Sequence, residues 1–244
     1  MAMMWIWGLM LWLGWGAIAP VYPATAILPP SAVLADFAAA IAPVETLQSV
    51  GERPIAQARQ QMGAVVTVTG WVTVPRGQFS SAMLDQGFAL ADASGGLYVS
   101  TDEPVEIAVG DALTVTGTMG DDGHGQRILV LKTWRRLPSV SPGSLPPPRP
   151  STTQQAGDLD GQLVTVTGTV SRGLVDDGPY GDRLWLADDS GEIQIYLPRS
   201  THIEPHTLPY LQPGQRLQVT GFSSQYDGSD EVIPRFPLDL QSLN

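Results

Sequence analysis

Short runs in which apolar and polar residues alternate appear twice along this chain, in the same order. Val65–Gly70 reads VVTVTG, and Leu163–Gly168 reads LVTVTG. Alternation over a few residues that stops at Gly, Asp or Ser is typical of half-buried strands followed by turns. The later runs also match in pairs: Phe88–Asp92 with Leu184–Asp188, Leu97–Val99 with Ile193–Ile195, and Val109–Gly117 with Pro213–Gly221. The pattern therefore predicts a tandem repeat of two all-β units.

Each unit is expected to contain too few short strands for a sandwich. Its first strand is long and contains a glycine, Gly70 in one copy and Gly168 in the other. Glycine lets a strand bend from one wall of a small barrel to the other. The predicted fold class is all-β, with two tandem five-stranded OB-fold barrels at residues 55–137 and 155–244.

Four motifs of the first unit stand in a fixed order: Ile55–Arg59 (IAQAR), Val66–Val72 (VTVTGWV), Asp92–Val99 (DASGGLYV) and Val109–Asp111 (VGD). They resemble the OB-fold modules associated with secreted bacterial nucleases and phosphoesterases, over residues 55 to about 131. The second unit departs from the pattern at Gly191–Ile195, Pro213–Gln215 and Thr152–Ala156. The resemblance implies a fold and a binding role, without the family's separate catalytic domain.

The first residues form an apolar segment. Residues 2–19 are almost entirely apolar and no charged residue precedes Asp36, while Ala24–Ala26 offers a small-x-small cleavage site. No basic residue precedes the segment, so it fits either a cleaved signal peptide or a retained membrane anchor. We predict a signal or anchor at residues 1–26, a spacer at 27–54, and an extracytoplasmic location that is secreted, periplasmic or membrane-anchored.

The predicted units are separated by a proline-rich stretch. Ser139–Pro150 contains five prolines, which favour an extended polyproline conformation. The sequence thus predicts a linker over residues 138–154 that holds the two units apart semi-rigidly.

Charge differs between the two units. The chain has 244 residues and a net charge of −11. Residues 60–137 hold five basic and eight acidic side chains, whereas residues 155–244 hold five and thirteen. An acidic surface repels phosphate backbones, so nucleic-acid binding is disfavoured in the second unit. The chain has no cysteine, which excludes disulfides and cysteine-ligated zinc.

Aromatic side chains alternate with the predicted core residues. If the valines and leucines of the strands fill the barrels, then Trp71, Tyr98, Trp185 and Tyr196 point outward. Rings on that wall of an OB fold stack on bases or sugars. The alternative is that these rings pack beneath the long loops or at an interface between the barrels.

Basic residues mark a second candidate surface. Lys132, Arg135 and Arg136 flank Trp134 at the end of the first unit, a combination suited to a phosphate backbone with a stacked base. The alternative is a solvated strand whose arginines lie along apolar surface. Arg76 and Arg172 recur after the first strand of each unit, in a loop that commonly rims an OB cleft.

Candidate catalytic and metal residues are few. His124, His202 and His206 have no partners at ligand-like spacing, and there is no Gly-x-Ser-x-Gly motif. Acidic clusters such as Asp176–Gly178 and Asp227–Glu231 could collect carboxylates for Ca²⁺, but they also fit ordinary tight turns. We therefore expect no enzyme, no cofactor and no assigned metal site.

Two functional hypotheses remain. The first is an exported, non-catalytic binding protein that engages single-stranded nucleic acid or another extended polymer, such as a polysaccharide, through the outward aromatics. The second is an interaction module that assembles with an envelope protein partner and binds no nucleic acid. If residues 2–19 are not removed, the membrane is a further partner.

Overall fold

The computed structural model describes residues 52–138 and 145–243, which belong to one compact unit. The predicted signal or anchor, nearly all of the spacer and part of the linker lie outside the described residues. Within the described ranges, no helix is both long and apolar enough to cross a membrane.

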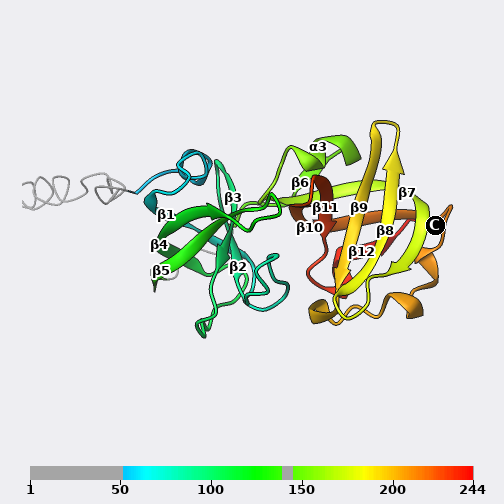
Figure 1. Ribbon diagram of the computed structural model, residues 1–244. Coiled ribbons are helices and arrows are strands. Elements are labelled where there is room, and N and C mark those ends of the chain that lie inside the picture. Colours follow the sequence, from blue (N-terminus) through cyan, green and yellow to red (C-terminus); the bar gives the residue numbers. More distant parts are fainter. Residues whose placement is uncertain (1–51, 139–144, 244) are drawn as a thin grey trace, which may run out of the picture. The chain divides into compact units, whose positions relative to one another are not determined.

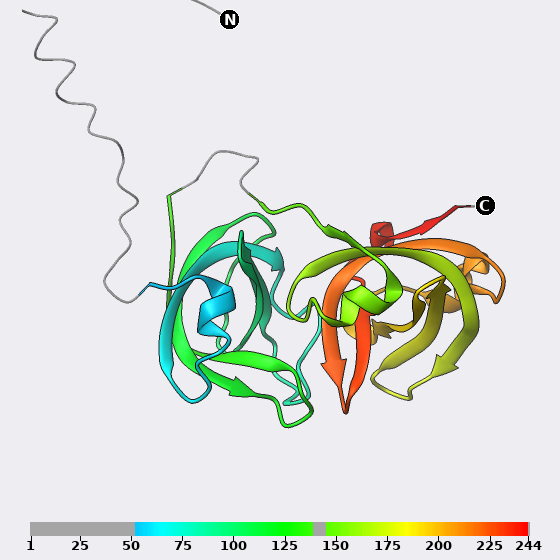
Figure 2. The same cartoon turned by 90° about the horizontal axis from the view of Figure 1, so that it is seen from above.

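The first half of the described chain forms a closed barrel (Figures 1 and 2). Its strands are paired in the order β1-β2-β3-β5-β4, and β3 and β5 are parallel whereas the other neighbours are antiparallel. This is the five-stranded arrangement of an OB fold, as predicted. Its elements are α2 (Ile55–Ala58), β1 (Val65–Val74), β2 (Phe88–Asp92), β3 (Gly95–Ser100), β4 (Ala112–Asp121) and β5 (Arg127–Arg136).

The interior of this barrel is filled by one face of each strand. Ile55 from α2 closes one end and is fully buried. Asp92 at the end of β2 holds α2 in place, because its Oδ2 accepts a hydrogen bond from the Ile55 N–H at 2.9 Å. Valines and leucines that the alternation directs inward are buried in this cluster together with Phe88: Val66, Val68, Val72, Leu90, Leu97 and Val99.

The second half forms a seven-stranded sheet in the order β12-β10-β11-β9-β8-β7-β6, in which β10 also pairs with β7. Five of its strands, β7, β8, β9, β11 and β10, therefore repeat the circular order of pairings of the first barrel. The elements are β6 (Arg149–Ser151), α3 (Thr153–Gly157), β7 (Leu163–Asp176), β8 (Gly181–Asp188), β9 (Gly191–Pro198), β10 (Arg216–Tyr226), β11 (Ser229–Ile233) and β12 (Leu240–Ser242), with short 3-10 turns at η1 (Arg199–Thr201), η2 (Pro205–Thr207), η3 (Pro209–Leu211) and η4 (Pro237–Asp239).

Two features of the predicted linker are wrong. Residues 149–151 are a strand, β6, which pairs in parallel with β7. The two halves are also in contact, because the apolar side chains that lie outside each strand ring bury one another. The shared cluster combines residues of both halves: Val74, Phe79, Ala89, Tyr98 and Ile128 with Phe222 and Ile233.

Polar contacts flank this shared apolar cluster. Arg59 of the first barrel forms an ion pair with Asp160, which lies in the turn between α3 and β7. Arg235 is held by Asp239 through two hydrogen bonds of 2.9 Å, and its Nη1 donates to the Thr73 carbonyl oxygen at 2.9 Å. A buried arginine needs all of these partners to offset its desolvation. The polar contacts therefore fix the orientation in which the apolar surfaces meet.

Two glycines allow the backbones to approach closely. A Cβ atom added to Gly96 in β3 would lie 1.9 Å from the Gly161 carbonyl oxygen. Gly161 itself has a φ of +86°, a conformation that favours glycine. The backbone atoms of Gly161 cannot move aside as a flexible side chain would. Position 96 must therefore be glycine, which has only a hydrogen atom where other residues have a side chain.

We expect Gly96→Ala to lower the free energy of unfolding by about 1–3 kcal/mol, because the added methyl group overpacks the junction. Gly120→Ala is the matched control, since a Cβ there meets nothing within 4 Å. Thermal and denaturant unfolding of both variants measures the difference. Equal stability of the two variants would contradict the close packing at Gly96.

Candidate functional site

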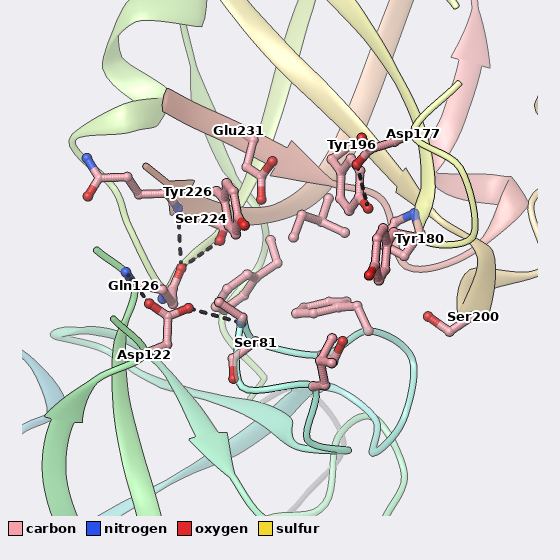
Figure 3. Close-up of a pocket in the computed structure, with 18 of the residues that line it drawn as sticks. Ser81, Asp122, Gln126, Asp177, Tyr180, Tyr196, Ser200, Ser224, Tyr226 and Glu231 are labelled. Atoms are coloured by element: carbon pink, nitrogen blue, oxygen red, sulfur yellow. Dashed lines mark hydrogen bonds between the residues drawn. The ribbon is translucent and has the colours of Figure 1, made fainter. Parts of the chain in front are cut away.

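A cleft of about 640 Å³ lies where the two halves meet. The loop before β2 and the turn between β4 and β5 line it from the first barrel. Strands β9, β10 and β11 and the turn between β7 and β8 line it from the second sheet (Figure 3). Its volume is in the range of small-molecule sites. Six of its lining residues are aromatic: Phe79, Tyr98, Tyr180, Tyr196, Phe222 and Tyr226.

Packed rings form the base of the cleft. The Phe79 and Phe222 ring centroids are 5.3 Å apart, and those of Phe79 and Tyr98 are 5.9 Å apart. The Tyr98 hydroxyl donates to Asp85 Oδ1 at 2.6 Å. Burial and the neighbouring Asp85 carboxylate raise the pKa of Tyr98 far above its usual value. Tyr98 is therefore a neutral, fixed part of the interface.

The edge on the first barrel is built around Asp122. Its Oδ1 accepts backbone N–H bonds from His124 at 2.9 Å and Gln126 at 3.1 Å, and its Oδ2 accepts from Ala82 at 3.1 Å. The side-chain oxygen of Gln126 in turn accepts a hydrogen bond of 2.6 Å from the Ser224 hydroxyl of the second sheet (Figure 3). This chain of bonds leaves the edge pre-organised.

His124 and Tyr226 reach across the two halves. Their rings stack with centroids 4.7 Å apart and an interplanar angle of 4°. The His124 Nδ1 lies 2.8 Å from Asp227 Oδ1. The stack places the half-exposed Tyr226 ring over one side of the cleft.

A buried carboxylate lies on the wall that the second sheet forms. Glu231 is 6% exposed, and its Oε2 accepts a hydrogen bond from Gln194 Nε2 at 2.8 Å. Burial is the main cause that raises the pKa of Glu231, to about 7, and the Asp177 carboxylate adds to it. The Gln194 hydrogen bond and the Arg183 charge act in the opposite direction. A carboxyl group with such a pKa in a cleft is a candidate functional group.

The arginines of the cleft are already paired with acids. Arg183 forms an ion pair with Asp177. Arg199 lies 2.9 Å from an oxygen of Asp176 and also pairs with the fully buried Asp182 at 2.5 Å. These pairs neutralise both guanidinium groups, so the cleft presents no unpaired cation from these two residues.

Two of the predicted ligand-binding residues line the cleft, Tyr98 and Tyr196. The prediction that Tyr98 faces solvent is wrong, because it is 1% exposed and covered by Phe79 and Phe222. Tyr196 is half-buried, and its hydroxyl lies 3.4 Å from Asp177 Oδ2. Burial, followed by the neighbouring acids, raises its pKa.

The other predicted residues lie elsewhere. Arg172 lies over the Trp185 ring, 4.1 Å from its centroid, and forms an ion pair with Glu192. That ring is therefore partly covered by the protein's own cation. Trp71 is half-buried, and Arg76 donates a hydrogen bond to the Asp102 carbonyl oxygen at 3.1 Å.

The basic segment of β5 is divided by its contacts. Trp134 is half-buried and packs against the first barrel core. Arg136 forms an ion pair with Asp111 at 3.2 Å. Lys132 and Arg135 are exposed, and their side chains make no hydrogen bond or ion pair within the described part of the chain. Only these two cations of the segment remain available to a ligand.

The residues that sequence reasoning missed are Glu231 and Gln194. Glu231 was taken as part of a turn cluster, Asp227–Glu231, whereas it begins the buried part of β11. The repeat itself held a usable signal, since Gln194 occupies the position of Tyr98 in the aligned copies. In the residues described, no group of three or more His, Cys, Asp or Glu is placed to hold a metal ion.

Comparisons with known proteins add little to this description. No protein-family model matches the sequence, and no curated protein matches it. An asparaginyl-tRNA synthetase from Pyrococcus horikoshii is similar over 38% of this chain and 23% of its own length, with 21% identity and a TM-score of 0.33. This chain thus spans less than a quarter of that synthetase.

Two smaller solved structures are similar over most of their own length. The hypothetical protein ygiW from E. coli has 18% identity and a TM-score of 0.30, over 39% of this chain and 90% of its own. OBody AM1L10, bound to hen egg-white lysozyme, has 21% identity and a TM-score of 0.33, over 41% of this chain and 99% of its own length. The fold assignment rests on the strand pairings of this chain.

The raised pKa of Glu231 predicts a pH-dependent stability. Its usual value of 4.5 rises to about 7 on folding, so its stabilising contribution is complete below about pH 4.5 and is lost as the pH rises through 7. At 1.36 kcal/mol per pKa unit the loss is about 3 kcal/mol. We expect Glu231→Gln to remove this loss, as measured by urea unfolding between pH 5 and 8.

Glu192→Gln is the control for this measurement. Glu192 is exposed, and hydrogen bonds from Arg172 and Ser171 lower its pKa. Its stabilising contribution is therefore present at neutral pH, is lost as the pH falls, and is small because the pair is solvated. Parallel stability curves for wild type and Glu231→Gln from pH 5 to 8 would show that Glu231 is not perturbed.

Proposed function

We propose that this protein is a non-catalytic binding protein made of two tandem OB-fold barrels, and that its ligand enters the cleft between them. The second barrel is the circuit of β7, β8, β9, β11 and β10, extended by β6 and β12. We further propose that it acts outside the cytoplasm, as its apolar N-terminal segment suggests. Affiliation with the modules of secreted nucleases remains a prediction.

The observation that carries this proposal is the composition of the cleft. It combines aromatic rings, pre-organised hydrogen-bonding groups and one carboxyl group with a perturbed pKa, which together are typical of a ligand site. The half-exposed rings of Tyr180 and Tyr226 offer stacking surface. Catalysis would require further groups arranged around a reacting atom, and the proposal assigns none.

Replacing an exposed cleft ring tests where the ligand binds. Tyr180 is 60% exposed, so Tyr180→Ala removes contact area with little effect on folding. We expect it to weaken ligand binding about tenfold, at roughly 1–3 kcal/mol per stacked ring. The measurement is saturation-transfer NMR of the full chain with maltotriose, spermidine and oligothymidylate as probes.

Trp71→Ala is the comparison variant, since it removes a ring of the originally predicted outer wall. The proposal expects this variant to bind like the wild type. Binding that depends on Trp71 and not on Tyr180 would place the ligand on the wall of the first barrel and overturn the cleft as the site.

A second candidate function has one observation in its favour. Lys132 and Arg135 are exposed cations near the end of β5 whose side chains have no partner in the described structure, and Trp134 lies between them in the sequence. This end of the first barrel is suited to a short stretch of single-stranded nucleic acid. The acidic second half opposes such binding at long range, so the second candidate is confined to this segment.

Salt-titrated binding of oligothymidylate tests this second function. We expect affinity to fall steeply between 50 and 200 mM salt, and each of Lys132→Ala and Arg135→Ala to reduce the logarithmic slope by about 1. Arg216→Ala, an exposed cation on β10, serves as the control. Absence of binding at low salt would remove nucleic acid as a ligand of this segment.

A further inference from the structure

The two copies differ in a way that points to a ligand class. In the first barrel Tyr98 of β3 pairs with Ile128 of β5, and both are buried in the shared apolar cluster. In the second barrel the equivalent parallel pair is Gln194 of β9 with Glu231 of β11. The next residues along, Val99 with Leu129 and Ile195 with Val232, are apolar core residues in both copies. The fold therefore accepts an apolar pair where this polar pair stands.

A buried carboxylate at such a position is costly for stability. The hydrogen-bonding partners of the Glu231 carboxylate, the Gln194 amide and the Ser224 hydroxyl, are both neutral. None of the described basic side chains forms an ion pair with Glu231, and Arg183 is already paired with Asp177. Burying a charge without a cation is unfavourable, and a group that costs stability without serving the fold is a candidate for function.

The surroundings of Glu231 suit a positive ligand. Figure 3 shows Glu231 between Tyr226 and Tyr196, with its carboxylate directed toward the cleft. Aromatic ring faces attract ammonium groups, most strongly where water is excluded. The Tyr180 and Tyr226 rings, which are 60% and 47% exposed, add apolar surface for an alkyl chain.

Charge on both walls favours the same sign of ligand. Asp122 on the first barrel and Asp177 and Glu231 on the second supply three carboxylates to the lining. The two lining arginines, Arg183 and Arg199, are held by acids, including Asp176 and Asp182 from outside the lining. When Asp176 and Asp182 are counted with the lining residues, the cleft carries a net negative charge. It therefore attracts cations and repels anions such as phosphates.

We propose that the cleft binds an organic cation, with an alkylammonium group against Glu231 and its hydrocarbon chain along the aromatic rings. A free polyamine and a lysine side chain of a peptide share this chemistry. The proposal rests on the cleft being the ligand site and names the class of ligand that the site takes.

Binding of such a cation is linked to the protonation of Glu231. Four groups act on or face Glu231: Asp177 from the turn between β7 and β8, Arg183 from β8, the Tyr196 hydroxyl from β9 and the Ser224 hydroxyl from β10. The ligand requires the ionised carboxylate, whose pKa of about 7 leaves it mostly protonated at pH 6 and mostly ionised at pH 8. Affinity therefore rises with pH across this range.

The test is isothermal titration calorimetry of the full chain with spermidine at pH 6 and pH 8. We expect spermidine to bind about tenfold more tightly at pH 8, and Glu231→Gln to weaken binding at pH 8 at least tenfold and to remove the pH dependence. Glu192→Gln removes an exposed acid from β9, the strand that also carries Gln194. We expect this variant to change neither the affinity for spermidine nor its pH dependence. A trilysine peptide in a parallel titration distinguishes a peptide source from a free amine.

Each outcome bears on one proposal or the other. Equal spermidine binding by wild type and Glu231→Gln, or no binding of either amine probe at millimolar concentration, overturns the cation proposal. Maltotriose binding that is lost in Tyr180→Ala, without amine binding, overturns the cation proposal while leaving the cleft as a binding site. Binding of amines that is insensitive to Tyr180→Ala and Glu231→Gln alike removes the cleft as the site.

Discussion

The burial of Tyr98 between Phe79 and Phe222 is the interaction on which the rest of the structure depends. A small five-stranded barrel has little interior, so apolar residues on the outer face of β3 and β5 need a second surface to cover them. The second sheet provides that surface with Phe222 and Ile233. Once the halves are joined in this way, the remaining space beside the rings becomes a cleft with walls from both halves.

Much of the fold could be predicted from the alternation of residues, for a simple physical reason. Side chains along a strand alternate between two faces, so the sequence separated Val66, Val68 and Val72 from their neighbours correctly, and the structure buries all three. Alternation specifies only the inner and outer faces of a strand. It does not state whether the outer face is covered by another part of the chain, which is why Tyr98 was expected in solvent.

The same limit explains the error in the linker. Proline content predicts local extension, but it does not determine the distance between the ends of a chain that returns on itself. The apolar cluster between the halves is formed by residues more than a hundred positions apart, such as Phe79 and Phe222. The Arg235 contact with Thr73 is equally distant in sequence. Pairing of this kind is not visible in a window of local sequence.

The candidate site was only partly predictable. Tyr196 was identified because its aromatic ring stands at a position that alternates with the apolar core residues of its strand. It does line the cleft. Glu231 was overlooked because an acid that follows Asp-Gly-Ser-Asp matches turn chemistry, and sequence alone gives no burial for a single acid. Aligning the two copies strand by strand exposes it, since the pairing places Glu231 where the first barrel has Ile128.

The two candidate surfaces are far enough apart to act independently. Ile128 and Arg135 lie on the same strand, seven residues apart, and a strand rises about 3.3 Å per residue, which separates the cleft end of β5 from its basic end by roughly 20 Å. This exceeds the Debye length of about 8 Å at physiological salt. The acids of the cleft are therefore screened from Arg135, and the two halves of the fold can hold oppositely charged sites at separate places.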